Sequence, residues 1–421
     1  MIHGPFRYDG RVRAPRATPI LLGASPKCDG RGVHRTVRAA RTWQRIEPLL
    51  GGLGVTRVCD ITGLDRVGIP VFSCVRPRAD RFGITVTCGK GRRPIDAKVG
   101  AAMEAIEYLS AEFDRPRCLT APAGDLAGRA LDPDSLILPA WAREHARYPL
   151  DWVEGWELVS RSPIWVPANA VFFPYEPEAS FFLFNPSTNG LAAGNTIEEA
   201  ICHGLAELLE RDAWSIALAR ADEGDCPSLD LATAPLPASE LARRFESAGV
   251  EVFVRVLASE FGIPCFYAAV LEVHDEARFL AHDGMGAHPD AEVALLRALT
   301  EAAQSRAADI QGSREDLSYW RARGMKAIDR DHWSFRRAGP VRFEDLPSFP
   351  APDVLDDIRW MMDRLVARGF DRVAVVELTR ADLGIPVVRV VVPGLESFSV
   401  DRWRAGPRLG APEPAPSGVL G

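Results

Sequence analysis

Hydrophobic residues recur at helical spacing between Asn189 and Trp214, directly after a glycine-rich turn. Thr196 precedes the apolar run and is placed to cap a helix, with Glu199 three residues later as its partner in a capping box. At 100° per residue, one side of this helix is apolar and is formed by Ile201, Leu205, Leu208, Leu209 and Ile216. The opposite side is polar and carries Glu199, His203, Glu207 and Glu210, with Arg211 at its margin.

This polar side has two interpretations. Such a stripe is usually a solvated surface. A solvated stripe normally mixes Lys and Arg with Glu at a spacing of four residues, however, and no Lys lies here. Its neighbours are small (Ala200, Gly204, Ala206), as if another element packs close to the backbone. Carboxylates three residues apart point the same way and can bind one hard cation.

The same patterns predict further helices over 36–50, 97–113, 291–310 and 355–369, and strands over 55–60, 68–75, 84–87, 152–156, 372–378 and 386–392. Three of the helices combine a Glu-x-x-(Glu/Gln) pair with small neighbours: Glu104/Glu107, Glu207/Glu210 and Glu301/Gln304. The irregular spacing of these units excludes a solenoid. We therefore predict an α/β fold of mixed α+β type, in which repeated strand–helix units bring their helices together on one acidic, metal-binding cleft.

Composition and charge exclude several classes of protein. The chain has 421 residues and a net charge of −7, which gives no overall sign of nucleic-acid or membrane-surface binding. Its eight cysteines include no C-x-x-C pair, which argues against a disulfide framework or a zinc module and fits a reducing compartment. The chain carries neither a signal-peptide pattern at its start nor an apolar run of the roughly 18 residues that span a bilayer. We expect a cytoplasmic protein.

Three segments are predicted along the chain. Residues 1–33 form a basic, loop-rich arm, residues 34–405 form one catalytic domain, and residues 406–421 form a tail rich in Pro and Gly. Within the domain, 119–160 is predicted to be irregular because it is rich in Pro, apart from the strand over 152–156 at its end. Segments 223–239 and 338–353 are predicted to be linkers or surface loops because they are rich in Pro, Ala and Asp.

Crowded carboxylates dictate the chemistry of the predicted cleft. They would raise one another's pKa and become protonated unless cations neutralise them. Oxygen ligands favour Mg²⁺ or Ca²⁺ over zinc, and Mg²⁺ in such sites bridges protein carboxylates and substrate phosphates. A nucleoside triphosphate is the natural ligand, and basic residues to meet its phosphates are available in Arg35, Lys90, Arg211 and Arg306. The sequence contains neither a P-loop nor the kinase motifs, and the neighbouring side chains of Cys202 and His203 diverge on a helix.

Seven motifs stand out: D-I-T-G-L-D-R-V-G-I-P-V (60–71), C-G-K-G (88–91), A-A-M-E-A-I-E (101–107), N-G-L-A-A-G-N-T-I-E-E-A (189–200), G-L-A-E-L-L-E-R-D-A (204–213), G-A-H-P-D-A-E-V-A-L-L-R-A-L-T-E-A-A-Q-S-R (286–306) and G-I-P-V-V-R-V-V-V-P-G-L-E (384–396). Together they make the chain resemble, over roughly residues 34–395, the YcaO superfamily of ATP-dependent enzymes that activate peptide backbone amides.

The resemblance implies a nucleotide site with Mg²⁺ ions between the acids and the phosphates of ATP. By motif, the Mg²⁺ ligands are Glu104, Glu107, Glu207 and Glu210, and the nucleotide contacts are Asn195, Glu199 and Arg211, with Arg35 and Thr42 on the first helix and Arg306 by analogy. It assigns no catalytic residue. Gly100 and Cys88 depart from the family's usual residues, but neither change removes an acid, so an active enzyme is expected.

The family's reaction begins when a nucleophile adds to an amide carbonyl, whose oxygen is then phosphorylated and leaves as phosphate. An internal Cys, Ser or Thr of the peptide gives an azoline, and external sulfide gives a thioamide. The tail bears on this choice, because Pro412, Pro414 and Pro416 fit the P-x-P-x-P pattern that reaches the active site in azoline-forming members. The region 60–71 is instead more similar to stand-alone members that work with a TfuA-like partner in thioamidation. Both products stay open.

The resemblance also implies partners. They are a precursor peptide and a separate leader-peptide-binding or TfuA-like protein, with a homodimer as a further candidate and neither nucleic acid nor a membrane expected. The alternative to an enzyme is a non-catalytic accessory protein of the same family, for example in the methylthiolation of a ribosomal protein.

Overall fold

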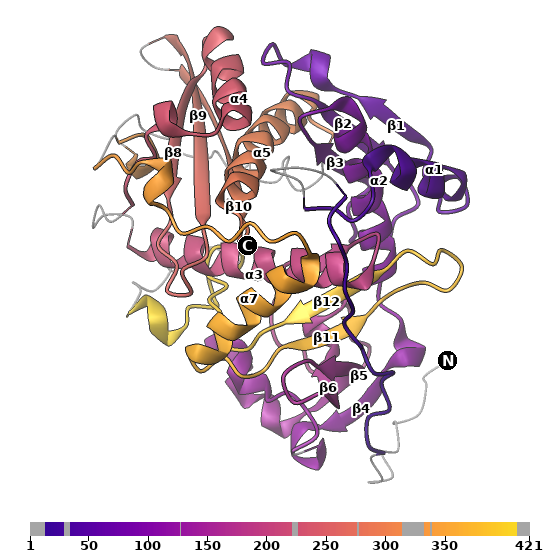
Figure 1. Ribbon diagram of the computed structural model, residues 1–421. Coiled ribbons are helices and arrows are strands. Elements are labelled where there is room, and N and C mark those ends of the chain that lie inside the picture. Colours follow the sequence, from indigo (N-terminus) through magenta and orange to yellow (C-terminus); the bar gives the residue numbers. More distant parts are fainter. Residues whose placement is uncertain are drawn as a thin grey trace.

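The computed structural model describes residues 13–28, 34–126, 128–220, 226–275, 278–313, 332–336 and 339–410, with the backbone alone at 274, 275, 278 and 279. Its described helices and strands form three antiparallel sheets, each with a helix packed against it (Figure 1). Two sheets each come from one part of the chain, and the third combines strands from residues 119–193 with strands from residues 374–391. The helices of the three sheets meet in the middle of the molecule. This arrangement confirms the predicted mixed α/β fold with repeated strand–helix units.

The first unit lies near the amino-terminal end of the described chain. Its sheet has the order β1-β2-β3, and α2 packs on β2 and β3 with α1 beside it. The elements are α1 (Ala39–Leu50), β1 (Arg57–Asp60), β2 (Val71–Val75), β3 (Val86–Lys90) and α2 (Pro94–Ala111). Pro94 lies in the first turn of α2, where a missing N–H costs nothing.

The second unit has the order β10-β9-β8, with α5 packed on β10 and β9. Its elements are α4 (Leu236–Ser247), β8 (Glu251–Val256), β9 (Cys265–Asp275), β10 (Arg278–Ala287) and α5 (Ala291–Gln311). Part of the predicted loop 223–239 is therefore wrong, because helix α4 starts at Leu236. Pro235 and Pro237, which suggested a loop, lie at the N-cap and in the first turn of α4.

The third unit contains a six-stranded sheet with the order β4-β5-β11-β12-β7, and β6 pairs with β5. Helix α3 packs on β12 and β7, and α7 packs on α3. The elements are β4 (Leu119–Pro122), β5 (Pro149–Glu157), β6 (Ser162–Pro167), β7 (Leu191–Ala193), α3 (Ile197–Ala219), α7 (Val354–Ala367), β11 (Ala374–Glu377) and β12 (Val387–Val391). The segment 119–160, predicted to be irregular apart from a strand over 152–156, thus also contains β4, and β5 is longer than the predicted strand.

Glycines allow each helix to pack closely on its sheet. A Cβ at Gly89 of β3 would lie 2.1 Å from the backbone of Ala97 and Ala101 in α2. A Cβ at Gly286 of β10 would lie 2.0 Å from the carbonyl oxygen of Ala294 in α5. This contact explains why small residues flank the acids, because backbones packed at this distance leave no space for side chains between them.

Gly286→Ala is therefore expected to destabilise the fold by about 1–3 kcal/mol through overpacking. Gly51→Ala is the control, since Gly51 has φ −62° and a Cβ added there would meet no atom within 4 Å, so that change should be neutral or slightly stabilising. Urea unfolding midpoints measure both. Equal midpoints for the two variants would contradict the close contact between β10 and α5.

Both ends of the described chain are packed against the body. Arg16 N–H donates to Glu154 of β5 (2.9 Å), and further along the chain Gly23 N–H donates to Glu198 of α3 (2.9 Å) and Ser25 N–H donates to Asp353 (2.9 Å), the N-cap residue of α7. At the other end, residues 406–410, which the sequence assigned to the tail, belong to the folded body. Pro412, Pro414 and Pro416 lie outside the described residues.

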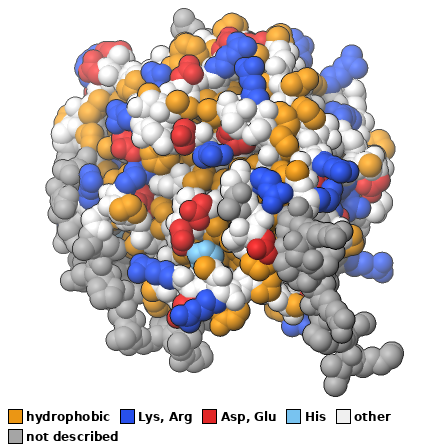
Figure 2. Space-filling view, turned by 90° about the horizontal axis from the view of Figure 1, so that it is seen from below, with side chains coloured by type: hydrophobic (Ala, Val, Ile, Leu, Met, Phe, Trp, Pro, Cys, Tyr) orange, Lys and Arg blue, Asp and Glu red, His pale blue; other side chains and the backbone are white. Residues whose placement is uncertain are grey.

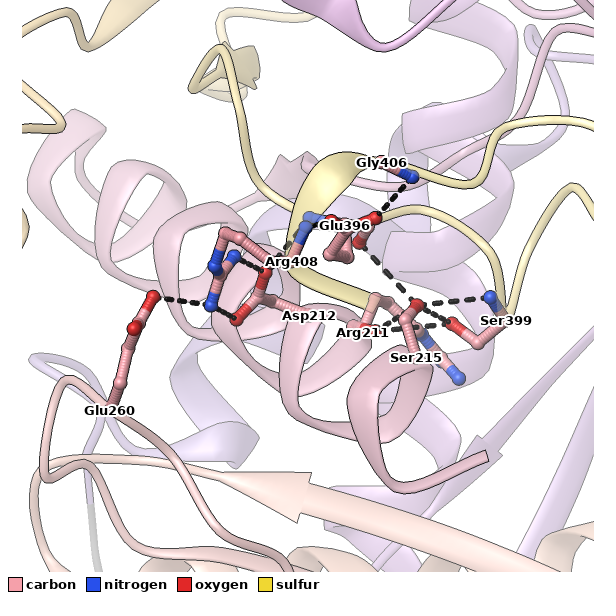
Figure 3. Close-up of polar contacts among 8 residues, drawn as sticks. All are labelled: Arg211, Asp212, Ser215, Glu260, Glu396, Ser399, Gly406 and Arg408. Carbon is pink, nitrogen blue, oxygen red and sulfur yellow. Dashed lines mark hydrogen bonds and ion pairs between the residues drawn. The ribbon is translucent and has the colours of Figure 1, made fainter. Parts of the chain in front are cut away.

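Three residues near the carboxyl end contact the back of α3: Glu396, Ser399 and Arg408 (Figure 3). With Gly406, which donates to Glu396, they form what we call the C-terminal clamp. Arg408 forms a bidentate ion pair with Asp212, which has no exposed surface. Glu396 accepts from the N–H groups of Gly406 (2.8 Å) and Arg408 (3.1 Å). The clamp thus fixes the side of α3 opposite its polar stripe.

None of the helices within the described residues combines the length and the apolar composition needed to cross a bilayer. The face in Figure 2 mixes Lys and Arg with Asp, Glu and hydrophobic side chains.

Candidate functional site

A cavity of about 1250 Å³ lies where the three units meet. Helices α2, α3 and α5 line it, together with residues of α1, β3 and β10. It receives the polar stripe of α3, so the stripe is an interior wall rather than a solvated surface. Glu210, for example, is only 2% exposed.

All four predicted metal ligands line this cavity, Glu104 and Glu107 from α2 and Glu207 and Glu210 from α3. Three of them are fixed by backbone N–H donors, each from a different sheet. Glu104 accepts from Cys88 of β3 (2.8 Å), Glu107 from Ala193 of β7 (2.7 Å) and Glu210 from Ala287 of β10 (3.0 Å). The three sheets therefore position the acids, which no single unit could do.

Burial and mutual repulsion weaken the acidity of this cluster. Burial, with the charges of Glu104 and Glu207, raises the pKa of Glu107 to about 8. Burial, with the charge of Glu210, raises the pKa of Glu207 to about 7. Burial also raises the pKa of Glu210. Such a cluster is stabilised by cations, and its all-oxygen donor set fits Mg²⁺.

The acids do not converge on one point. Among the described residues, the one group of three His, Cys, Asp or Glu with ligand atoms all within 4.8 Å of one another is Cys202, His288 and Asp357. Each ion in the cavity would therefore take few protein ligands and complete its shell from another molecule. Mg²⁺ bound with a nucleotide has this requirement, because it retains waters and phosphate oxygens.

Four of the predicted nucleotide contacts also line the cavity: Arg35, Thr42, Asn195 and Arg211. Thr42 Oγ1 donates to Asn195 Oδ1 (2.7 Å), which joins α1 to the turn before α3. Arg211 Nη2 lies 3.5 Å from Glu210 Oε1, and the charges of Glu210 and its acidic neighbours outweigh burial and raise the pKa of Arg211. Acids and bases thus share one cavity that is large enough for a nucleotide.

The sequence model of one protein family, described as YcaO cyclodehydratase, ATP- and Mg²⁺-binding, matches residues 88–396. The chain belongs to the YcaO family. This confirms the family predicted from the motifs, and the family's description agrees with ATP and Mg²⁺ as the expected cofactors.

Two relatives and one solved structure resemble this YcaO protein along nearly their whole length. An uncharacterized protein of Methanothermobacter thermautotrophicus is 40% identical over 386 residues, which cover 89% of this chain and 98% of that protein. An uncharacterized protein in the tfuA 3′ region of Rhizobium leguminosarum bv. trifolii is 34% identical over 375 residues, covering 86% and 88%. The structure of YcaO from Methanopyrus kandleri bound with AMPPCP and Mg²⁺ has a TM-score of 0.74 at 30% identity, covering 92% of this chain and 99% of that one.

Glu199 of this YcaO protein is not part of the cavity lining. Its side chain accepts hydrogen bonds from Thr36 and from both the N–H and the side-chain amide of Asn195 (2.8 Å each). Thr196 caps α3 as predicted, accepting from Glu199 N–H (3.2 Å), but Glu199 does not return the bond to Thr196 and the predicted capping box is half formed. Glu199 thus orders the turn that presents Asn195.

Arg306, which was assigned as a nucleotide contact by analogy, lies outside the cavity lining. Its side chain is 1% exposed, does not line the cavity and forms ion pairs with Asp65 (2.9 Å) and Glu272 (2.8 Å). Asp65 follows β1 and Glu272 lies on β9, so Arg306 joins the first and second units. Its guanidinium therefore serves to hold these two units together.

Two basic residues take the place expected of Arg306. Lys90 at the end of β3 forms an ion pair with Glu301 of α5, and Arg297 lies one turn before Glu301. Both line the cavity. Arg297 could have been found from the sequence, because it shares the polar face of α5 with Glu301 and Gln304 at helical spacing.

The group formed by Cys202, His288 and Asp357 does not fit a metal. His288 Nδ1 accepts from Asp290 N–H (3.0 Å), so the ring proton lies on Nε2, the nitrogen nearest Asp357. A protonated nitrogen has no lone pair for a metal. Lys27 Nζ lies 2.6 Å from Asp357 and already supplies a cation. This group fastens the amino-terminal arm to α7.

The raised pKa values predict how Mg²⁺ binding depends on pH. Glu107 and Glu207 must be ionised to bind the ion, so the affinity for Mg²⁺ with nucleotide should rise as pH passes through about 7 and about 8 and then level off. The ligand-free protein should show the opposite trend, because acids with raised pKa stabilise the fold below their ordinary value of 4.5 and lose this contribution as pH rises through 7 to 8.

Isothermal titration calorimetry in buffers of different ionisation enthalpy measures the affinity and counts the protons released on binding. Thermal unfolding of the ligand-free protein measures the opposing trend. Binding that is independent of pH and releases no protons would show that these carboxyls do not hold the ion.

Proposed function

We propose that this YcaO protein uses Mg²⁺ and ATP to activate a backbone amide of a peptide by phosphorylation of the amide oxygen. The observation that carries the proposal is the set of four glutamates that α2 and α3 present in the cavity, three of them oriented by backbone N–H groups of the three sheets. Bound ATP would supply an electrophilic phosphoryl group that turns a poor leaving oxygen into phosphate. The binding of AMPPCP and Mg²⁺ by the Methanopyrus protein supports the choice of ligands.

In this proposal, different residues bind the Mg²⁺ ions and the nucleotide. Glu104, Glu107, Glu207 and Glu210 hold the Mg²⁺ ions, and Asn195, Arg35, Thr42 and Arg211 contact the nucleotide. Glu199 acts on the nucleotide only through Asn195. Arg297 and Lys90 are cations at the phosphate side, in place of Arg306. Positive charge aimed at the transferring phosphoryl group stabilises the charge that develops on it.

The remaining space of the cavity is suited to a peptide. Residues of α4, α5 and β10 line it, among them Leu241, Ala281 and Leu296 together with Tyr267. Tyr267 donates to Asp283 Oδ2 (2.5 Å), so this part combines apolar surface with a few oriented polar groups, as ligand pockets do. We assign the amide substrate to this side.

More specifically, we propose that the protein works with a TfuA-like partner and that its product is a thioamide. The relative in the tfuA 3′ region supports it, since that protein and this chain share sequence over most of both lengths. An azoline product is the alternative. Retention of all four acids in the cavity favours an enzyme over a non-catalytic accessory protein. We propose a cytoplasmic location, where ATP and reduced sulfur donors are present.

The experiment incubates the protein with Mg²⁺, ATP, a candidate precursor peptide that carries ¹⁸O in its backbone amides, and a TfuA-like partner. Activation of the amide oxygen predicts ¹⁸O in the released phosphate. The peptide mass then separates the products, since loss of water marks an azoline and exchange of oxygen for sulfur marks a thioamide. Phosphate release without ¹⁸O would overturn the proposed chemistry, and absence of Mg²⁺-dependent nucleotide binding would overturn the enzyme itself.

A further inference from the structure

His203 lies on the wall of the cavity that carries the metal-binding acids. It is on α3, one turn before Glu207, and it lines the cavity. Its neighbour Cys202 points elsewhere and is buried, so the pair has no shared chemistry. The polar stripe of α3 thus holds one imidazole whose role the glutamates do not explain.

Across the cavity, His203 meets Arg297 of α5. Arg297 Nη1 lies 2.8 Å from His203 Nδ1. A guanidinium can only donate hydrogen bonds, so Nδ1 must be the acceptor and the ring proton must lie on Nε2. His203 is therefore neutral in this contact. Burial, with the charges of Arg297 and Arg35, holds the pKa of His203 well below its usual range, which agrees with the neutral form.

A neutral partner is unusual among the cations of this region. Lys90 forms an ion pair with Glu301, and Arg306 forms ion pairs with Asp65 and Glu272. Among the described residues, no carboxylate lies within ion-pair distance of Arg297 in the structure, and its buried Nε atom has no hydrogen-bond partner. Arg297 is thus held by a neutral partner without a direct ion pair, although its charge still acts on Glu207, Glu210 and Glu301.

We propose that His203 is a positioning residue that orients Arg297 through a neutral hydrogen bond, so that the guanidinium is not taken up by a direct ion pair and can bind the phosphates of the nucleotide. A carboxylate at position 203 would hold Arg297 equally well but would neutralise it. Imidazole provides the same hydrogen bond and leaves the charge for the ligand. The inference rests on the proposed nucleotide function.

Three substitutions separate orientation from charge. His203→Asn keeps an acceptor, Oδ1, near the place of Nδ1 and should bind Mg²⁺ with AMPPCP within about threefold of the unchanged protein. His203→Leu removes the acceptor and should weaken this binding about tenfold. His203→Asp keeps an acceptor but forms an ion pair with Arg297, and it should weaken binding at least as much as His203→Leu.

Adenosine is the control ligand, because it lacks phosphates. A positioning role through Arg297 predicts the same adenosine affinity in all three variants, whereas general damage to the cavity would weaken adenosine binding too. In an Arg297→Met background, His203→Leu should have no further effect on AMPPCP binding. Unchanged AMPPCP binding in His203→Leu, or an equal loss in the Arg297→Met background, would overturn the inference.

A measurement without nucleotide keeps the test independent of the proposed function. ¹⁵N NMR of labelled histidine should show His203 with its proton on Nε2 at neutral pH, and Arg297→Met should change this signal. A charged His203, or a proton on Nδ1, would refute the contact even if the protein bound no nucleotide. Failure of the unchanged protein to bind Mg²⁺ with AMPPCP, with the expected NMR signal, would refute the proposed function and with it the role assigned to Arg297.

Discussion

Replacement of Glu207 by Gln is expected to abolish Mg²⁺-dependent nucleotide binding while it stabilises the ligand-free protein. The affinity for Mg²⁺ with AMPPCP should fall at least about 100-fold, because the change removes a charged ligand of the ion, and the interactions of such an ion are worth several kcal/mol. The unfolding temperature without ligand should rise at about pH 8, since burial and the charge of Glu210 raise the pKa of Glu207 and oppose its ionised form.

A gain in stability together with a loss of nucleotide binding is typical of a binding site whose crowded charges destabilise the ligand-free protein. A structural glutamate would behave differently, because its loss would lower stability and leave nucleotide binding unchanged. Glu246→Gln on the exposed side of α4 is the matched control and should change neither quantity. Calorimetry and thermal unfolding give both values on the same samples. Weaker folding together with normal binding in Glu207→Gln would refute the metal-binding role.

The sequence was sufficient to predict the acids of the cavity. Periodicity placed Glu207 and Glu210 on one side of a helix, and the repeated acidic pair with small neighbours predicted that several helices share one centre. The backbone donors that orient the acids could not be predicted, because Cys88 and Ala287 are far from their partners in sequence and contribute only an N–H group.

The two nucleotide assignments that the structure places outside the cavity have different causes. Arg306 follows Arg297 by nine residues, which at 100° per residue puts it on the opposite side of α5, so helical periodicity itself argued against the analogy. Glu199 lies on the correct helix, but its carboxylate turns to Thr36 and Asn195 rather than to the cavity. The direction of the Glu199 carboxylate depends on Thr36, which lies before α1 and comes close to Glu199 only in the folded structure.

The second unit was the least predictable part of the fold. Strand β10 carries Gly284 and Gly286 and lacks the alternation of apolar and polar residues that indicates a strand. Its glycines are explained by α5, whose backbone lies against them. The residues of β10 are thus chosen for close packing against α5 rather than for strand alternation, so the local sequence does not indicate a strand.

Replacement of Arg408 by Met is expected to destabilise the protein by about 3–5 kcal/mol and to weaken nucleotide binding as well. Arg408 pairs with Asp212, which is fully buried, and with Glu260. Without Arg408, the Asp212 carboxylate keeps only the N–H of Glu396 (2.8 Å) as a partner among the described residues. A buried charge left without its counterion costs far more than a surface ion pair contributes.

Two controls test this explanation. The double variant Asp212→Asn with Arg408→Met removes both charges and should recover most of the lost stability. Arg380→Met breaks an exposed ion pair with Asp382 (3.2 Å) and should cost less than about 1 kcal/mol. Chemical unfolding measures all three variants. A double variant as unstable as Arg408→Met would show that packing, rather than the unpaired charge, is responsible.

The effect on binding follows from where the clamp contacts α3. Ser399 of the clamp donates to the carbonyl oxygen of Arg211 (3.1 Å), and Ser215 donates to the same oxygen (2.7 Å) (Figure 3). Arg211 therefore has its backbone fixed by the clamp and its side chain in the cavity. Loosening the clamp should weaken Mg²⁺ with AMPPCP more than adenosine, because Arg211 serves the charged part of the ligand. Equal weakening of both ligands would instead indicate a general loss of the cavity.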